Sequence, residues 1–193
     1  MPKIEYSNLS KNYNNIVFFI SKTQELNNIS LPSSIDFDLK NKSFRKNLEK
    51  DKQIELNLFT NNQKFKVFFI LLDFKCTNFY VKGATLYNKF KYVNNSNVYF
   101  YFSEKIIAKY YNYIADIILG FQIKSYKYEK FINKKTSKPN ILYINTKSKK
   151  LFKIINYNSN IFFSINFTKD LVSEPANILN PVEFASRCKN LNI

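Results

Sequence analysis

Short apolar runs separated by polar turn signals predict β-strands in the first half of the chain. Residues 16–20 are all β-branched or aromatic, which is typical of a buried strand. Residues 54–58 alternate between apolar and polar, Asn residues at 61–62 offer a turn, and residues 67–72 are again continuously apolar. This pattern predicts a hairpin that leads into a central strand of a sheet.

Further along, apolar residues at helical spacing alternate with another strand signal. Residues 79–90 predict a helix, residues 97–102 a strand, and Ser103 and Glu104 the opening of a second helix. An apolar stripe at steps of three and four follows in that helix and must pack against other elements: Ile107, Tyr110, Ile114, Ile117, Ile118 and Phe121. This alternation of strands and helices predicts an α/β layer fold.

The last third of the sequence predicts a strand at residues 140–145 and then two helices. The first of these helices carries one mainly apolar face, formed by Leu151, Ile154, Ile155, Asn158, Phe162, Ile165 and Val172. We expect it to end at Glu174, because a residue that precedes proline avoids the helical backbone conformation. Asn180 and Pro181 then supply an N-cap and a first-turn proline for the second helix.

Composition limits the chemistry that the chain can perform. With 193 residues and 45% hydrophobic side chains, the sequence is that of a globular protein with one domain, or one domain and part of another. It contains no His, which excludes histidine-based nucleophile triads, histidine zinc sites and histidine general bases. Its two glycines are too few for a Gly-rich phosphate loop or a dinucleotide-binding turn.

The formal charge of +16 suggests nucleic acid or an anionic membrane as a partner. The type of cation weakens that interpretation, because Arg45 and Arg187 are the only arginines and all the other cations are Lys. Lys, Asn, Ile, Phe and Tyr share AT-rich codons, so that much of the basicity can reflect nucleotide composition. Bidentate recognition of bases and phosphates also favours Arg over Lys.

The lysines are nevertheless concentrated between residues 124 and 153, where aromatic residues are interleaved with them. Such a segment could stack on single-stranded bases while the lysines follow the phosphate backbone. We favour the alternative of a solvated loop and helix face whose aromatic residues point into the core. The candidate anion or nucleic-acid contacts are Lys124, Lys127, Lys130, Lys134, Lys135, Lys147, Lys149 and Lys150.

Processing and redox signals are weak. The first residues contain no apolar core of signal-peptide length, and the run at 67–72 is far shorter than the ~20 residues of a membrane span. We therefore expect a cytoplasmic protein with no membrane partner. Cys76 and Cys188 lack a metal-ligand or redox spacing and are interpreted as two inert thiols.

The most specific pattern lies in residues 168–185, which read Thr-Lys-Asp-Leu-Val-Ser-Glu-Pro-Ala-Asn-Ile-Leu-Asn-Pro-Val-Glu-Phe-Ala. This segment resembles the one that opens the catalytic domain of the leucyl (cytosol) aminopeptidases. Lys169, Ser173 and Asn180 stand where that family usually has Arg, Asn and Thr. A looser match lies at residues 114–131, where a helix with glycine is followed by a Tyr-rich loop.

The resemblance implies a domain organisation. Residues 1–150 would be the N-terminal domain of such an aminopeptidase, a macro-domain-like α/β fold with a layered mixed sheet and flanking helices. Residues 151–173 would form a long interdomain helix, and residues 174–193 the truncated start of the metallopeptidase catalytic domain. In this arrangement apolar surface is left exposed on the last segment, from Leu171, Val172, Ile178, Leu179 and Phe184.

The family removes N-terminal amino acids from peptides with two divalent metals, zinc or manganese, and assembles as homo-hexamers mainly through its catalytic domain. Its ligand motifs resemble Val-Gly-Lys-Gly and Asn-Thr-Asp-Ala-Glu-Gly-Arg-Leu, and neither occurs in this sequence. No catalytic or metal-binding residue can therefore be assigned, and we give Asp170 and Glu174 a structural role. We expect the chain to be inactive and without bound metal on its own, as a fragment, a split gene or a decayed copy. The alternative is a basic nucleic-acid-binding α/β module.

Overall fold

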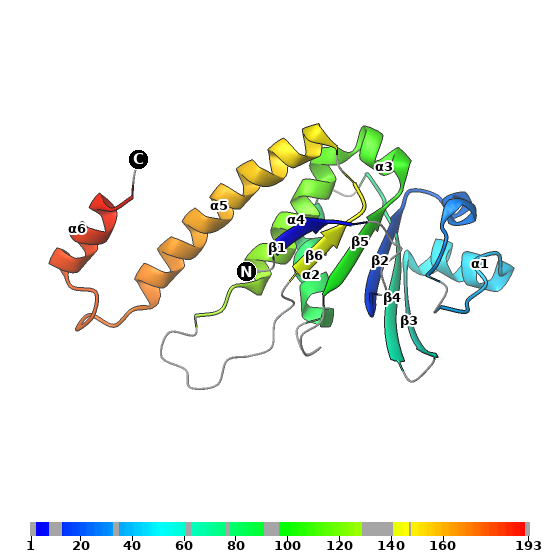
Figure 1. The fold of residues 1–193 in the computed structure, drawn as a ribbon, viewed down its shortest axis with the longest axis horizontal. Helices are drawn as coiled ribbons and strands as arrows, with labels where there is room; N and C mark the ends of the chain where they lie inside the picture. The colour runs from blue at the N-terminus through cyan, green and yellow to red at the C-terminus, as the bar shows by residue number, and fades with distance from the viewer. Residues whose placement is uncertain are drawn as a thin grey trace.

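A six-stranded sheet forms the centre of the structure (Figure 1), a computed structural model that describes residues 3–7, 13–32, 35–60, 63–75, 78–90, 97–128, 141–146 and 148–191. The strands are β1 (Lys3–Tyr6), β2 (Asn15–Ile20), β3 (Gln53–Thr60), β4 (Gln63–Leu71), β5 (Val98–Phe102) and β6 (Ile141–Ile144). Their order is β1-β6-β5-β2-β4-β3, and every neighbouring pair is parallel except β3 and β4. The predicted α/β class with a mixed, layered sheet is confirmed.

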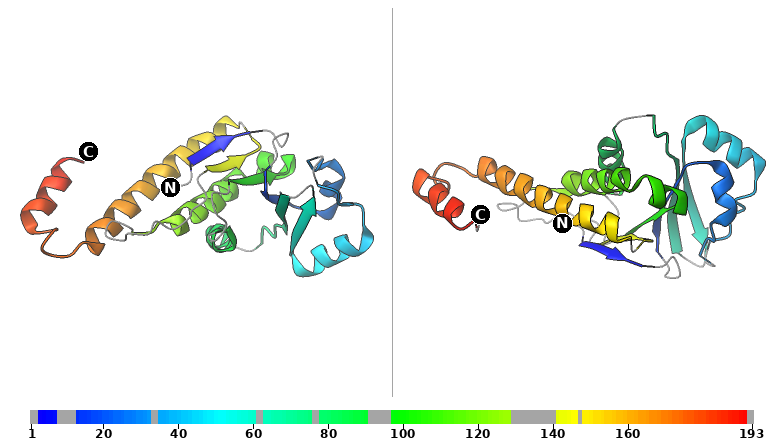
Figure 2. Two further views of the ribbon diagram at one scale, coloured as in Figure 1. Left: turned by 60° about the horizontal axis from the view of Figure 1, so that its bottom comes forward. Right: turned by 90° about the horizontal axis from the view of Figure 1, so that it is seen from above.

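Helices cover both faces of this sheet (Figures 1 and 2). One face packs against α2 (Phe79–Phe90), α3 (Glu104–Lys109), α4 (Tyr111–Ser125) and the first half of α5 (Lys149–Ser173). The other face packs against the short 3-10 helix η1 (Thr23–Asn28) and α1 (Lys42–Asp51). The last helix is α6 (Pro181–Lys189). No helix within the described ranges is long and apolar enough to cross a bilayer.

Strand β2 shows why a continuous apolar run was needed at the centre. All six of its residues are buried, because helices lie on both sides of it. Val17 and Phe19 point toward α2 and α4, whereas Phe18 and its neighbours point toward α1. Each fully buried Phe contributes about 2 kcal/mol through removal of its surface from water.

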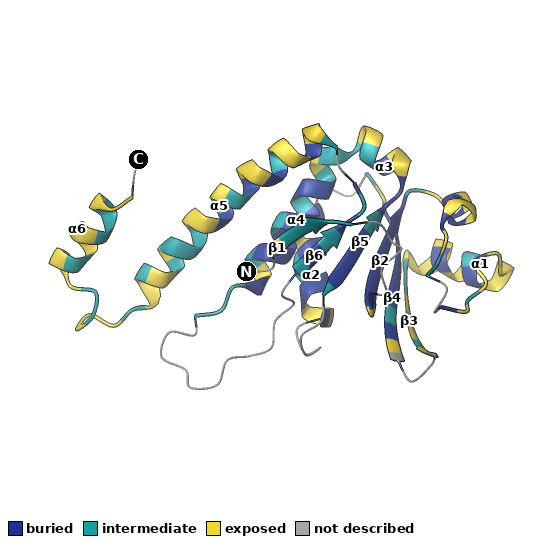
Figure 3. Ribbon diagram, in the orientation of Figure 1, coloured by how far each residue is buried: buried dark blue, intermediate teal, exposed yellow. Residues whose placement is uncertain are grey.

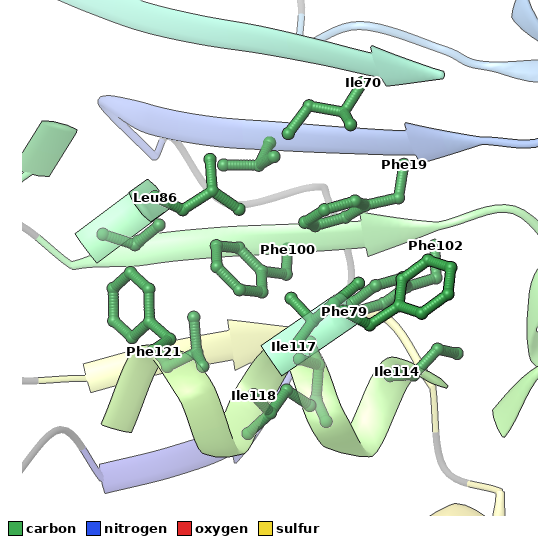
Figure 4. Packing of buried hydrophobic residues seen from close by; sticks show 14 of the residues in the cluster. Phe19, Ile70, Phe79, Leu86, Phe100, Phe102, Ile114, Ile117, Ile118 and Phe121 are labelled. Carbon is green, nitrogen blue, oxygen red and sulfur yellow. The ribbon is translucent and has the colours of Figure 1, made fainter. Parts of the chain in front are cut away.

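The larger core is dominated by aromatic contacts between sheet and helices. Figure 4 shows Phe19, Phe100 and Phe102 of the sheet facing side chains of α4. The Phe19 and Phe102 rings stack with centroids 4.6 Å apart, and Phe100 meets Phe121 of α4 edge to face at 5.3 Å. Such aromatic pairs add roughly 1 kcal/mol beyond the area they bury.

Most predicted elements are present, with two corrections. The helix expected from Ser103 onward is broken at Tyr110, whose φ of −123° and ψ of 31° leave the helical region and separate α3 from α4. At the break, the Tyr110 ring lies flat on Phe74 with centroids 3.6 Å apart. The predicted apolar face of α5 is buried only as far as Phe162, and Val172 at its end is 81% exposed, because α5 there extends past the sheet. The predicted turn at 61–62 lies outside the described residues.

Three elements of the structure were not predicted from the sequence. Strand β1 has only four residues, too few to establish a period. Helix α1 buries only Phe44 and Leu48, yet its start carries a recognisable signal, since the Asn41 side chain accepts a hydrogen bond from the Phe44 amide at 3.1 Å. The 3-10 helix η1 is a single short turn region and had no periodic signal.

Glu55 on β3 links three elements and makes stability depend on pH. Its carboxylate lies 3.0 Å from Lys66 on β4 and 3.5 Å from Lys89 on α2. Burial works to raise the pKa of Glu55, but the hydrogen bond and charge of Lys66, followed by those of Lys89, outweigh burial and hold this pKa below its ordinary value of 4.5. Glu55 therefore stabilises the fold above that ordinary value, and the contribution is lost as the pH falls through the lowered one.

We expect Glu55→Gln to lower the melting temperature at pH 7 by about 2 °C, as is usual for partly exposed ion pairs. The difference from the unsubstituted chain should vanish at acid pH, where the Glu55 carboxylate is protonated. Calorimetry across pH 3 to 7 measures this, with Asp51→Asn, an exposed change at the end of α1, as control. A Glu55→Gln difference that stays constant over this range would contradict the assignment.

Candidate functional site

The C-terminal segment, residues 163–191, is the part of the described chain that contributes no buried residue to the hydrophobic core. Helix α5 has 25 residues, which is about 37 Å of helix, and its buried positions end at Phe162. From there to residue 191, across the second half of α5 and all of α6, no described residue is buried (Figure 3). Val172 and Val182 are 81% and 80% exposed.

The predicted exposure of five apolar residues in this segment is confirmed in part. Val172 is open to solvent, and Phe184 is 47% exposed. Leu171, Ile178 and Leu179 are instead half-buried, because the chain folds back on itself between α5 and α6. Apolar surface of this kind, presented without a covering layer, is a feature of interaction sites.

Two polar contacts fix how α5 lies on α4. The Asn158 side-chain amide donates to the carbonyl of Ala115 at 3.4 Å, and the Tyr126 hydroxyl donates to Asp170 at 2.5 Å. Both contacts join residues 43 or 44 positions apart, so the two helices run parallel and in a single register. Asn158, the one polar member of the predicted apolar face, thus has a partner in the helix that this face covers.

Tyr126 anchors the far end of the helix pair, just after α4 ends at Ser125. Burial, then the hydrogen bond and negative charge of Asp170, raise the pKa of the Tyr126 phenol to about 12, so it stays a neutral donor. The ammonium of Lys169 lies 5.0 Å from the centre of the Tyr126 ring, a favourable cation–π distance. These contacts hold the second half of α5 in place without a buried apolar core.

A second anchor sets the turn between α5 and α6. Pro175 follows the end of α5, and Asn180 caps α6 by accepting a hydrogen bond from the Glu183 amide at 2.9 Å. The Arg187 guanidinium lies 2.8 Å from Glu174 and 2.7 Å from Glu183, and the hydrogen bonds to Glu183 and then Glu174 raise the pKa of Arg187. The Glu174 side chain is only 1% exposed, and this ion pair offsets part of the cost of burying its charge.

A hollow of about 440 Å³ lies where these anchors meet, lined among others by Tyr126, Phe167, Asp170, Glu174 and Arg187. The charged groups that line this hollow have partners within the chain: Arg187 pairs with Glu174, and Asp170 accepts a hydrogen bond from Tyr126. These contacts fix the turn between α5 and α6, which we call the joint. The end of α5 and the start of α6 were predicted from the sequence, as was a structural role for the two carboxylates, whereas the contacts of Tyr126 and Arg187 were not. The spacing of Glu183 and Arg187, four residues apart on one helix, was the available signal for the second.

The structure separates the candidate lysines that it describes. Lys124 and Lys127 lie at the end of α4, whereas Lys149 and Lys150 lie in the first turn of α5. Because α4 and α5 run parallel, these two pairs stand at opposite ends of the helix pair (Figure 1). The remaining candidates lie outside the described residues: Lys130, Lys134, Lys135 and Lys147. Nucleic-acid binding by this segment stays a prediction.

Metal and thiol chemistry have no visible centre in the described ranges. No group of three or more Cys, Asp or Glu residues there could hold a metal ion. Cys188 on α6 is a free thiol, and Cys76 is not among the residues described.

Comparison with known proteins gives a likeness in structure and none in sequence. No protein-family model matches the chain, and no curated protein matches its sequence. A mutant of tomato leucine aminopeptidase matches the structure with a TM-score of 0.65 and 13% identity, over 98% of this chain and 42% of the tomato chain. The bottromycin maturation enzyme BotP, solved in complex with Mn, matches with a TM-score of 0.57 and 12% identity, over 92% of this chain and 36% of its own.

At these identities the likeness concerns the fold. The six-stranded, mostly parallel sheet with flanking helices is consistent with the N-terminal domain of leucine aminopeptidase. The chain spans less than half the length of either solved structure. The structure therefore has the aminopeptidase-like α/β fold that the resemblance at residues 168–185 led us to expect.

Proposed function

We propose that this chain serves as the non-catalytic N-terminal domain of a metal-dependent aminopeptidase. In this proposal residues 1–150 form the α/β domain, residues 151–173 the interdomain helix, and residues 174–193 the start of the catalytic domain. Removal of N-terminal amino acids from peptides would be the activity of the whole enzyme, and the metals, zinc or manganese, would be held by its catalytic domain.

The observation that carries the proposal is the unburied C-terminal segment. The likeness to tomato leucine aminopeptidase takes in 98% of this chain, so it continues beyond the sheet into the helices at residues 149–191. Within those helices the described residues past Phe162 have no core of their own. A segment that keeps a defined shape while leaving apolar side chains exposed is suited to contact another domain.

The contacts at the joint support a positioning role. The Asn158 and Tyr126 hydrogen bonds fix α5 on α4, and the Arg187 ion pair with Glu174 fixes α6 against the end of α5. Together they would set the direction in which a catalytic domain leaves the sheet. No residue of this chain is assigned a step in peptide hydrolysis.

The assay that tests the proposal is hydrolysis of leucyl p-nitroanilide with added manganese or zinc. We expect no turnover by the purified chain, because the Lys and carboxylate motifs that hold two metals are absent from the sequence. Tomato leucine aminopeptidase serves as the positive control. Metal-dependent turnover by the chain alone would overturn the proposal.

A second test looks for a gain of activity instead of its absence. The nucleotide sequence downstream of codon 193 should encode motifs resembling Val-Gly-Lys-Gly and Asn-Thr-Asp-Ala-Glu-Gly-Arg-Leu, in frame or after a frameshift. The joined product is expected to gain metal-dependent activity and to assemble as a hexamer, as measured by light scattering. A joined product that folds and binds metal but shows no turnover would contradict the proposal.

A further inference from the structure

A groove of about 350 Å³ lies between strand β1 and the part of helix α5 from Phe152 to Phe163, apart from the joint at α6. Ile4 and Tyr6 of β1 line it on one side. The α5 side contributes one helical stripe, which consists of Phe152, Asn156, Ser159 and Phe163 together with Ile155. Strand β1 and the stripe run side by side, since the rings of Tyr6 and Phe152 are 5.3 Å apart.

The groove presents apolar surface that nothing in the described chain covers. Phe152 is 45% exposed and Phe163 is 59% exposed, although the opposite face of α5 is buried as far as Phe162. The groove residues between them on this stripe, Asn156 and Ser159, are polar and shorter. Two exposed aromatic side chains thus stand along one helix stripe with shorter side chains between them, a spacing suited to an extended chain with side chains at intervals.

Strand β1 also offers backbone hydrogen-bonding groups. It is the last strand in the sheet order and pairs in parallel with β6, through Lys3–Ile141 to Tyr6–Ile144. Its other edge pairs with no strand in the described ranges. An open edge of this kind accepts an added strand from another chain, with main-chain hydrogen bonds giving affinity and side-chain pockets giving selectivity.

The charge around the groove selects the kind of chain that fits. Lys3 lines the groove, and Lys149 and Lys153 are exposed on the first turns of α5, one turn or less from Phe152. No acidic residue occurs between residues 149 and 169, and the nearby Glu5 is paired with Lys3 at 2.8 Å. Lys149, one of the lysines predicted to contact anions, thus lies on the same helix face as the groove residues Phe152 and Asn156.

We propose that the β1–α5 groove binds an extended acidic segment of a partner protein, which adds as a strand to the free edge of β1. Alternate side chains of this segment lie between Phe152 and Phe163, and its carboxylates face Lys149 and Lys153. The contact needs neither a catalytic domain nor α6, so it goes beyond the aminopeptidase proposal and does not depend on it.

The probe is a fluorescein-labelled peptide of sequence Glu-Val-Glu-Val-Glu-Val-Glu-Val, titrated with the purified chain and followed by fluorescence anisotropy. Its matched control has Lys in place of every Glu. We expect the acidic peptide to bind and the basic one to bind at least about tenfold more weakly, because the lysines around the groove repel it. Hydrogen exchange at residues 3–6 should slow when the acidic peptide is bound.

Variants locate the binding on this groove. Phe163→Ser should weaken binding of the acidic peptide by about tenfold, as loss of an aromatic anchor does. Tyr157→Ser removes an aromatic residue of similar exposure, 66%, from α5 outside the groove and should leave binding unchanged. Circular dichroism checks that both variants fold, which their high exposure in the unsubstituted chain leads us to expect.

Other outcomes of these experiments would contradict the groove proposal. Equal binding of both peptides, no binding of the acidic one, or unchanged binding in Phe163→Ser would overturn the proposal. So would a dimer, seen by light scattering, that Phe163→Ser dissolves, because the occupant would then be a second copy of the chain. Inactivity or activity toward leucyl p-nitroanilide leaves these results unaffected, so the two proposals fail separately.

Discussion

Replacing Gly83 with alanine is expected to destabilise the chain by about 3 kcal/mol and to lower its melting temperature by about 6 to 12 °C. Gly83 lies on α2 where this helix crosses α4. A Cβ atom at this position would stand 1.9 Å from the carbonyl oxygen of Ile117 and 2.8 Å from the amide nitrogen of Phe121. Both are backbone atoms inside a helix, so relief requires moving α4 as a whole.

The sign of this change is diagnostic, because Gly to Ala inside a helix ordinarily stabilises it by about 1 kcal/mol. Gly120 of α4 makes the reciprocal approach, with a Cβ 1.9 Å from the carbonyl oxygen of Tyr80, so Gly120→Ala should behave alike. Asn112→Ala, an exposed change on α4, is the control and should not lower the melting temperature. A Gly83→Ala chain that melts at or above the original would show that the two helices lie further apart.

Replacing Arg187 with methionine should release α6 from the end of α5. The substitution removes the guanidinium 2.8 Å from Glu174, whose side chain is 1% exposed, and leaves that carboxylate without this ion pair. We expect α6 to detach in response, because α6 itself contains no buried residue that would hold it. Cleavage by thermolysin at the apolar residues 178–184 should therefore accelerate about tenfold or more.

Lys189→Met is the matched control, since it also removes a cation from α6 but at an exposed position. Arg187→Lys should fall between the two, because one ammonium cannot reproduce the contacts of the guanidinium with both Glu174 and Glu183. The melting temperature of the sheet domain should change little in all three variants. An Arg187→Met chain cleaved at the original rate would refute the idea that this ion pair holds the joint.

Elements with a strong local pattern were predicted from the sequence almost to the residue. The helix at residues 79–90 and the strand at 16–20 are present, because their apolar spacing or continuity reflects burial that a whole element shares. The break at Tyr110 could not be predicted, since the apolar stripe continues across it and the reason lies in the ring of Phe74, 36 residues earlier. Local pattern carries no information about such a contact.

The candidate site shows the same difference between local signals, which the sequence carries, and long-range contacts, which it does not. The end of α5 follows from Pro175 and the start of α6 from the cap at Asn180, because both residues act on backbone within a few positions. The hydrogen bond between Tyr126 and Asp170 joins positions 44 residues apart, and the close approach of Gly83 to Ile117 exists only once two helices cross. The described lysines of the 124–153 cluster are likewise close in sequence but lie at opposite ends of the α4–α5 pair in the structure.

The lack of buried residues beyond Phe162 has an evolutionary consequence. Substitutions in the C-terminal segment cost the sheet domain little, so its own stability places almost no selection on residues 163–191. Any stronger constraint on the stretch from 168 to 185 would have to come from what these residues contact outside the sheet domain.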